Sequence, residues 1–288
     1  VKEIYLPEKV YKAKIAIETT DVPSMGYTQL TIDLKGDTSA PLQEITTNTI
    51  ENEYYQITVN SNGSLDILDK TNQVLYQNQG IIEENGDDGD SFNYSPPVKD
   101  FVISSIDAQP TISIQQSAIY QKIDVAFTLR VPKDLAERAE KKVSASLPIQ
   151  LTIVLKKQSQ QIDFNLTVEN QQVDSHRVCV LFDTGIASKF SLADQQFGTL
   201  QRPVVFEKEM ALGEANKEQW NEQPIAIETC QSFVGLFDAS HGVAVMPKGV
   251  REYEIVGKAF DTIRLTIFRT YGFMGKENLL YRPGRASG

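Results

Sequence analysis

The chain has 288 residues, with 28 Lys and Arg against 38 Asp and Glu and a net charge of −10. An acidic surface repels phosphate backbones, which excludes a nucleic-acid partner, and no stretch reaches the roughly 20 apolar residues that span a bilayer, which excludes a membrane partner. The two cysteines, Cys179 and Cys230, lie in apolar alternating segments without a CxxC pair, which predicts a soluble protein of the reducing cytoplasm.

The first 45 residues form the first predicted unit. The segment "VYKAKIAIETTDVPSMGYTQLTIDL" (residues 10–34) predicts two strands around a Pro-Ser-Met-Gly turn. The polar stretch "KGDTSAPLQEITTNT" (residues 35–49) follows and is typical of a joint. We therefore expect a small β segment, or part of a preceding β-subdomain, at residues 1–45 and a large β-sandwich at residues 46–288.

Alternation of apolar and polar residues dominates the rest of the chain and predicts strands with one buried face. Two short alternating runs flank the Asn-Ser-Asn-Gly turn at residues 60–63, which predicts a hairpin. Longer alternating runs occupy residues 123–131, 149–155 and 162–168. More continuous apolar runs at residues 177–182, 233–237, 243–246 and 263–268 predict central strands covered on both faces.

One stretch favours a helix, "KDLAERAEKKVSA" at residues 133–145, which we interpret as a crossover or mobile insertion between two long strands. Long strands with few helices between them predict antiparallel sheets packed face to face. The predicted fold class is therefore all-β, as one large antiparallel β-sandwich.

The stretch "EENGDDGDSFNYSPP" (residues 83–97) invites comparison with a calcium-binding loop. Three oxygen-bearing residues at its start have the stagger of alternate ligands, but Asp88 stands where the loop needs Gly, and Tyr94 where it needs a bidentate Glu. We predict no metal here. We expect Asp87, Asp88 and Asp90 to fix the loop through Asx-type bonds to main-chain N–H groups.

Other catalytic patterns are missing from the sequence. A zinc site needs three or four converging ligands, and the only histidines, His176 and His241, have no second His at ligand spacing. We expect His176 to orient a loop and His241 to lie in a hairpin turn. No G-x-S-x-G elbow or phosphate-binding glycine loop occurs. The residues alone predict a protein that binds rather than catalyses.

A longer pattern covers residues 50–97, where Glu-Asn-x-x-Tyr, Asn-Gly-Ser-Leu, Asp-Lys and Gly-Asp-x-Gly-Asp-x-x-Asn-Tyr-Ser-Pro-Pro follow in order. Further fragments are "DSHRVCVLFDTG" (174–185), "DQQFGTLQRP" (194–203), "REYEIV" (251–256), "LTIFRTYGFMG" (265–275) and "LLYRPG" (279–284). Together they resemble the C-terminal β-region of glycoside hydrolase family 38, the α-mannosidases. The resemblance is closest to the bacterial branch of α-mannosidases and mannosylglycerate hydrolases.

The resemblance implies a piece of a longer protein. In that family an N-terminal α/β domain and a helical bundle carry the zinc ion, the aspartate nucleophile and the acid/base carboxylate of a retaining mechanism, while the β-region folds like the mutarotase supersandwich. This chain is then a non-catalytic region without a cofactor of its own, inactive alone. Its expected partners are its own catalytic domain and an α-mannoside substrate, and a homodimer stays open.

The resemblance also implies substrate contacts. In eukaryotic members a Tyr and an Arg of the β-region contact substrate, and their counterparts by motif are Tyr94 in "SFNYSPP" and Arg202 in "FGTLQRP". A phenol can hydrogen-bond developing charge while its ring packs on a sugar, and a guanidinium presents a fixed fork to hydroxyl or carboxylate groups. Asp90 joins them as a predicted substrate-binding residue because it lies next to this motif.

Two alternatives stay open. A stand-alone carbohydrate-binding module on the same scaffold would bind sugar without the rest of an enzyme. A mutarotase-type epimerase would need a His and a Glu facing each other in the sandwich cleft, and the presence of only two histidines counts against it.

Overall fold

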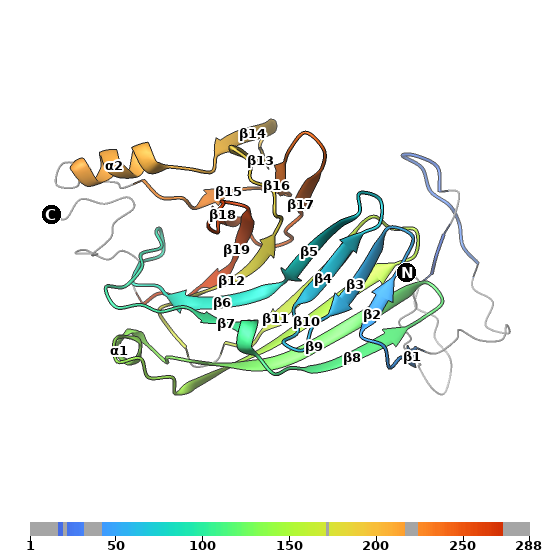
Figure 1. Cartoon of the computed structure of the whole chain (residues 1–288), viewed down its shortest axis with the longest axis horizontal. Coiled ribbons are helices and arrows are strands. Elements are labelled where there is room, and N and C mark those ends of the chain that lie inside the picture. Colours follow the sequence, from blue (N-terminus) through green and yellow to red (C-terminus); the bar gives the residue numbers. More distant parts are fainter. Residues whose placement is uncertain (1–16, 20–21, 32–41, 171–172, 217–223, 273–288) are drawn as a thin grey trace, which may run out of the picture.

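The computed structural model describes residues 17–19, 22–31, 42–170, 173–216 and 224–272. These residues are built mainly from β-strands, which confirms the all-β prediction (Figure 1). The strands divide among four antiparallel sheets, which we name A to D. Within the described part of the chain, no helix is long and apolar enough to cross a membrane.

Neighbouring strands in each sheet follow one another in the order below. Sheet A contains β1 (Gln43–Glu44), β8 (Thr111–Gln116), β9 (Tyr120–Val131), β10 (Ala145–Lys156) and β11 (Ile162–Val168). Sheet B contains β2 (Thr49–Glu51), β3 (Tyr55–Val59), β4 (Leu65–Asp69) and β5 (Val74–Gln79). Sheet C contains β15 (Glu228–Thr229), β18 (Glu252–Val256), β19 (Thr262–Arg269), β12 (His176–Asp183), β6 (Ile81–Gly86) and β7 (Ile103–Ser104). Sheet D contains β14 (Gly198–Pro203), β13 (Phe190–Gln195), β16 (Val234–Phe237) and β17 (Gly242–Val245).

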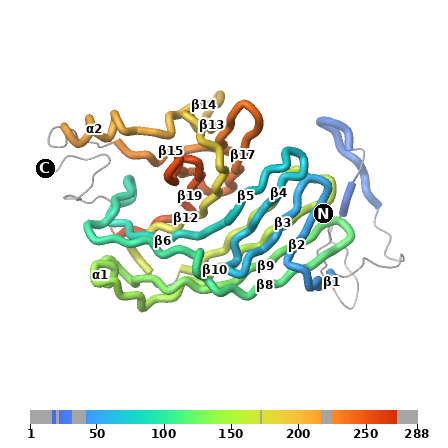
Figure 2. Tube along the Cα trace, in the orientation of Figure 1, coloured from blue at the N-terminus to red at the C-terminus, as the bar shows by residue number. Residues whose placement is uncertain are grey.

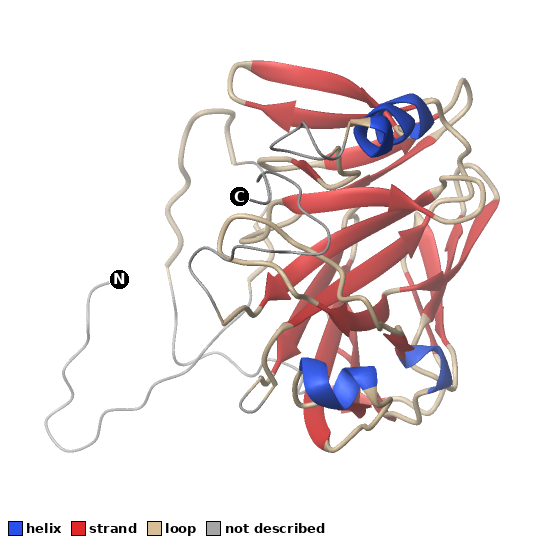
Figure 3. Ribbon diagram, turned by 90° about the vertical axis from the view of Figure 1, so that its left-hand side faces the viewer, coloured by secondary structure: helices blue, strands red, loops and turns tan. Residues whose placement is uncertain are grey.

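One face of sheet A supplies much of the core. Strands β9, β10 and β11 pair along most of their lengths, so their alternating apolar residues line up on one face. One end of this face packs on sheet B around the fully buried Ile57 and Ile123. The other end packs on sheets C and D, around Leu147, Val178 and Leu236. Figure 3 shows the resulting stack of strands, with short helices at its margins.

The predicted hairpin at residues 60–63 joins β3 to β4, which confirms its position. The N–H of Gly63 donates to the carbonyl of Asn60 at 2.9 Å, and Gly63 has φ +86°. A Cβ at Gly63 would fall 2.6 Å from a methyl of Val125 on sheet A. Glycine is therefore required both by the turn and by the close approach of sheets A and B.

The predicted helix at residues 133–145 is too long and is not part of a crossover. Helix α1 covers only Leu135–Ala139, with Asp134 as its N-cap. Lys141 adopts φ +57°, which ends the helical path. From Ala145 the chain pairs directly with β9, so the segment is a hairpin connection inside sheet A. Figure 2 shows α1 at the same end of the molecule as the loop after β6.

Two further differences concern sheet D and its neighbourhood. The run at residues 243–246, predicted to be a central strand, forms the edge strand β17, whose residues are exposed in alternation. An edge strand lacks a neighbour on one side, so it can be apolar without being covered on both faces. Helix α2 (Glu207–Ala215) was not predicted, although its residues are good helix formers.

The predicted N-terminal unit lies largely outside the described residues. The turn in its middle is present, because the N–H of Gly26 donates to the carbonyl of Pro23 at 3.0 Å. Residues 17–19 and 22–31 contain no strand, and the remainder of the two predicted strands falls on residues 10–16, 20–21 and 32–34, which are not described. Strand β1 already belongs to sheet A through its pairing with β8. The boundary at residue 45 stays a prediction.

Replacing Ile153 with Ala should lower the free energy of unfolding by about 2–5 kcal/mol, because truncation of a fully buried side chain leaves a cavity. Urea denaturation followed by circular dichroism measures the loss. Gln150→Ala, on the exposed face of the same strand, is the control and should change stability by less than about 0.5 kcal/mol. Equal losses in the two variants would contradict the assignment of the two faces of β10.

Candidate functional site

Residues 87–100 leave the end of β6 as a loop, which we name the Tyr94 loop. Asp87 is buried at its base, and one carboxylate oxygen accepts N–H bonds from Gly89 at 2.9 Å and Ser95 at 3.2 Å. The other oxygen accepts from Nε of Arg269 at 2.7 Å. A Cβ at Gly89 would fall 2.0 Å from the carbonyl oxygen of Asn93, so the tight path of the loop needs glycine there.

Asp90 organises the next turn of the loop. Its side chain is fully buried, and Oδ1 accepts the N–H groups of Phe92 at 2.9 Å and Asn93 at 3.0 Å. The Asx-type bonds predicted for the loop acids are thus present at Asp87 and Asp90. These carboxylates hold the backbone in the shape that presents Tyr94.

Tyr94 is half-buried against sheet C. Its hydroxyl oxygen accepts a hydrogen bond from the side-chain amide of Asn85 at 2.7 Å. The guanidinium of Arg177 lies 4.0 Å from the ring centroid and that of Arg269 lies 5.8 Å away, both within cation–π range. Burial raises the pKa of Tyr94 to about 12, although the charge of Arg177 acts in the opposite direction.

Tyr94 lies on a face of sheet C where buried charges are matched in pairs. Arg177 and Glu254 are 2.8 Å apart, an ion pair without the alignment of a hydrogen bond. Arg264 lies 3.6 Å from both Glu83 and Glu254. Arg269 pairs with Asp87, so three guanidinium groups lie beside three carboxylates on this face. We name it the polar face of sheet C, and it consists of Glu83, Asn85, Asp87, Arg177, Glu254, Arg264 and Arg269.

Arg202 lies elsewhere. Its guanidinium bonds the carbonyl of Thr229 at 2.9 Å and the hydroxyl of Tyr253 at 3.2 Å, and Nε lies 3.0 Å from Glu228. Tyr253 and Glu254 are consecutive on β18, so their side chains point to opposite faces of sheet C. Because Glu254 belongs to the polar face, the structure places Arg202 on the other side of the sheet from Tyr94.

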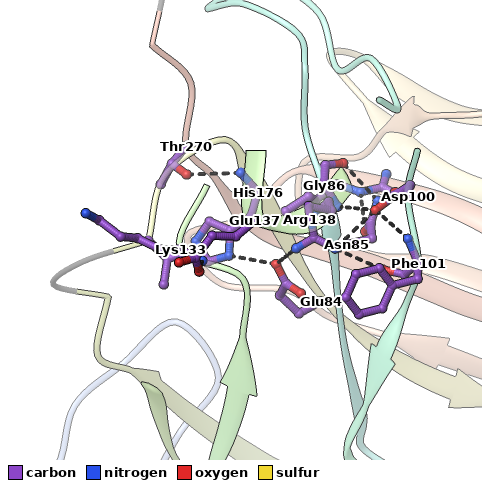
Figure 4. A network of polar contacts seen from close by, with 12 residues as sticks. Glu84, Asn85, Gly86, Asp100, Phe101, Lys133, Glu137, Arg138, His176 and Thr270 are labelled. Carbon is purple, nitrogen blue, oxygen red and sulfur yellow. Dashed lines mark hydrogen bonds and ion pairs between the residues drawn. The ribbon is translucent and has the colours of Figure 1, made fainter. Parts of the chain in front are cut away.

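A second polar network, drawn in Figure 4, closes the base of the Tyr94 loop on the opposite side of β6. The buried Arg138 of α1 forms an ion pair with the buried Glu84 and donates to Asp100 at 3.1 Å and to the carbonyl of Phe101 at 2.9 Å. The N–H of Gly86 donates to Asp100 at 3.0 Å. No local sequence pattern indicates this group of contacts, which we name the Glu84 network, because Glu84 and Arg138 are 54 residues apart.

His176 belongs to the same network. Its Nδ1 lies 3.2 Å from Glu84, and its Nε2 lies 3.1 Å from the amide of Asn170, so it orients a loop as predicted. A His and a Glu therefore do face each other, as the epimerase alternative requires. Both side chains are 0% exposed and Glu84 is bound to Arg138, so a sugar has no access to them.

The remaining predicted residues have simple structural roles. The N–H of His241 donates to Asp238 at 2.9 Å in the turn between β16 and β17, which confirms its predicted place. Cys179 and Cys230 are buried free thiols, and burial raises the pKa of both. Neither cysteine contributes to a disulfide within the part of the chain that the structure describes.

A shallow groove of about 440 Å³ crosses the outer face of sheet A. Its lining includes Ala126, Thr128, Pro148, Gln150 and Thr167. These residues alternate with the core residues of β9, β10 and β11 and therefore face away from the core. The groove is a separate surface from the Tyr94 loop.

Comparison with known proteins gives the family. Residues 50–273 match the model of the glycosyl hydrolases family 38 C-terminal domain. This match covers most of the chain, which therefore belongs to the C-terminal domain family of the family 38 glycosyl hydrolases. The resemblance inferred from the sequence motifs is confirmed.

Individual relatives agree with the family. A protein of Halalkalibacterium halodurans whose name places it among the mannosylglycerate hydrolases is 25% identical over 253 residues, covering 82% of this chain and 27% of the relative. An α-mannosidase structure from Enterococcus faecalis V583 has a TM-score of 0.70 at 27% identity, covering 82% of this chain and 27% of the other. A second family 38 structure from Enterococcus faecalis, with a TM-score of 0.67 at 24% identity, covers 89% and 30%. The chain thus spans less than a third of the length of these relatives.

Replacing Arg138 with Met should destabilise the chain by about 3–5 kcal/mol, because it leaves the fully buried Glu84 carboxylate without its countercharge. Chemical denaturation at pH 7 measures the loss. The double variant Glu84→Gln/Arg138→Met, which removes both charges, should recover part of it. A double variant less stable than Arg138→Met would contradict the view that the unpaired charge causes the loss.

The stability of the chain should depend on Tyr94 at high pH. The pKa of Tyr94 is raised from 10.0 to about 12 by burial, so the unfolded chain loses this proton first. The stability that comes from keeping Tyr94 protonated in the folded state is complete below about pH 10 and is lost as the pH rises through about 12. Denaturation of wild type and Tyr94→Phe across this interval should give a smaller decline for the variant. Tyr27→Phe, at a tyrosine that is 89% exposed, should keep the decline of the wild type.

Proposed function

We propose that this chain is the non-catalytic C-terminal β-region of a retaining α-mannosidase-like glycoside hydrolase. The family match over residues 50–273 carries the proposal. Further support comes from relatives named as a mannosylglycerate hydrolase and an α-mannosidase, of which the chain covers only 27%. In this proposal the chain packs on a separate catalytic domain and completes the rim of its sugar pocket.

The proposed scaffold is the mutarotase-like supersandwich. Support comes from the long face of sheet A, which packs on sheet B at one end and on sheets C and D at the other. In this interpretation sheet A is one layer and sheets B, C and D share the second layer.

Tyr94 is the proposed substrate contact. It is presented on a loop held by Asp87 and Asp90, and its ring is stacked on Arg177. The geometry favours Tyr94 over Arg202, whose guanidinium already bonds Glu228 and Thr229 on the other side of sheet C. It also favours Tyr94 over Asp90, because the Asp90 carboxylate is buried within the loop.

The chemical groups of the reaction belong to the proposed catalytic domain. A retaining mechanism needs a nucleophile and an acid/base carboxyl group about 5 Å apart, and the family resemblance adds a zinc ion. The same resemblance assigns both carboxyl groups and the zinc ion to the N-terminal catalytic domain, and we propose the same arrangement here.

A cytoplasmic location is part of the proposal, and a homodimer stays open. The two thiols of Cys179 and Cys230 are free and buried, which is the usual state of cysteines in a reducing compartment.

The 288-residue chain should not hydrolyse an aryl α-mannoside, whereas the full-length enzyme with its zinc-loaded catalytic domain should. Release of the aryl alcohol, followed by absorbance, compares the two at equal molar concentration. A catalytic domain expressed without this chain is the matched control and should lose activity because the pocket rim is incomplete. Turnover by the isolated chain would overturn the proposal.

A stand-alone carbohydrate-binding module is the second candidate, favoured by the polar groove on the outer face of sheet A. Calorimetric titration of the isolated chain with methyl α-mannoside distinguishes the two functions. Micromolar binding that is lost in Thr128→Ala/Gln150→Ala would favour the module. The absence of binding together with an active full-length enzyme would favour the catalytic-domain partner.

A further inference from the structure

Asn85 uses the full hydrogen-bonding capacity of its side-chain amide. Its oxygen accepts from Nε of Arg177 at 3.3 Å and from a terminal nitrogen of Arg264 at 3.2 Å. Its nitrogen donates to the hydroxyl of Tyr94 at 2.7 Å and to the carbonyl of Gly86 at 3.2 Å. Asn85 is 3% exposed, so its amide contacts these protein groups and not solvent.

These partners permit only one orientation of the amide. A guanidinium has donors and no acceptor, and a main-chain carbonyl accepts and never donates. Rotation of the amide by 180° would set its NH₂ group against two guanidinium groups and its oxygen against the carbonyl of Gly86. Arg177 and Arg264 are held in turn by Glu254, so the orientation of Asn85 is determined by the charges around it.

The orientation of Asn85 decides what Tyr94 can do. Because the amide can offer only N–H toward the phenol, the Tyr94 oxygen acts as the acceptor in this bond. A phenol has one O–H proton, and among the described residues the bond from Asn85 is the only hydrogen bond at this oxygen. The O–H proton is therefore not engaged by any described side chain or main-chain group.

The surroundings keep that proton in place. Burial raises the pKa of Tyr94 to about 12, so the phenol is neutral throughout the range in which enzymes work. The guanidinium of Arg177, 4.0 Å from the ring centroid, fixes the ring from one face. The hydroxyl thus has a fixed position, a fixed protonation state and a fixed direction of donation.

We propose that Asn85, oriented by Arg177 and Arg264, is a positioning residue that makes Tyr94 an obligate hydrogen-bond donor to an acceptor oxygen of its ligand. The acceptor is a carboxylate or a sugar oxygen without a proton to give, such as a ring or glycosidic oxygen. That the ligand is the substrate of a glycoside hydrolase rests on the proposed function. The direction of the Asn85–Tyr94 hydrogen bond is independent of the proposed function.

The direction of that bond can be measured on the isolated chain. The intensity ratio of the tyrosine Fermi doublet in the Raman spectrum is high when the phenolic oxygen accepts a hydrogen bond and low when it donates one. Subtracting the spectrum of Tyr94→Phe isolates the signal of Tyr94. In Asn85→Asp, the carboxylate beside two guanidinium groups stays ionised and can only accept. The Tyr94 ratio should therefore fall in that variant.

Asn165→Asp, at an exposed position of β11, adds the same charge and should leave the Tyr94 ratio unchanged. A wild-type ratio already at the donor value, or no change in Asn85→Asp, would overturn the proposed direction. If Asn85→Asp does not fold, the difference spectrum of wild type and Tyr94→Phe still decides between the two directions.

The ligand half of the proposal is tested in the full-length enzyme on an aryl α-mannoside. Tyr94→Phe and Asn85→Asp should each lower kcat/KM by about 10- to 100-fold, the cost of leaving one buried hydrogen bond to the ligand unmade. The double variant should be no worse than either single variant, because both remove the same bond. A merely structural role of Asn85 would give additive losses and would contradict positioning. If the Raman ratio of Tyr94 falls in Asn85→Asp but both single variants keep full activity, donation from Tyr94 to the ligand is refuted. The direction of the Asn85–Tyr94 hydrogen bond would remain supported.

Discussion

Strand β6 turns alternate side chains to opposite faces of sheet C, and the two polar networks around the Tyr94 loop depend on that alternation. Asn85 points to the polar face, where it meets Tyr94, whereas Glu84 points to the side of Arg138 and His176. The register of β6 against β12 fixes these directions, since a slip of one residue would exchange the faces. The Tyr94 loop begins where this strand ends and is therefore held from both sides of the sheet.

Buried charges contribute to geometry here more than to stability. Removing ions from water is costly, and a buried ion pair does little better than apolar residues of the same size. What a pair such as Arg269 with Asp87 adds is direction, because a guanidinium and a carboxylate bond well only in a few arrangements. A loop that holds one tyrosine in a single orientation needs that direction more than it needs additional stability.

Local patterns in the sequence predicted the all-β class, the hairpin at residues 60–63 and the long strands β9, β10 and β11, because alternation and turn residues act over a few positions. Motif resemblance predicted the family and selected Tyr94. The division into four sheets, the edge position of β17 and the partners of Tyr94 could not be predicted, since they depend on contacts between distant segments. One signal was available: "IIEENG" places acids on both faces of a strand that the fold buries, which is a pattern that requires partners.

The partners of the Tyr94 loop also determine when it can form. Asn85 bonds Arg264, 179 residues further along the chain, and Asp87 bonds Arg269, 182 residues further. During synthesis, β6 and the loop leave the ribosome long before β19 exists to receive them. The Asx-type bonds within the loop can form early, but its attachment to sheet C needs β19 and must therefore wait until nearly all of the described chain has been synthesised.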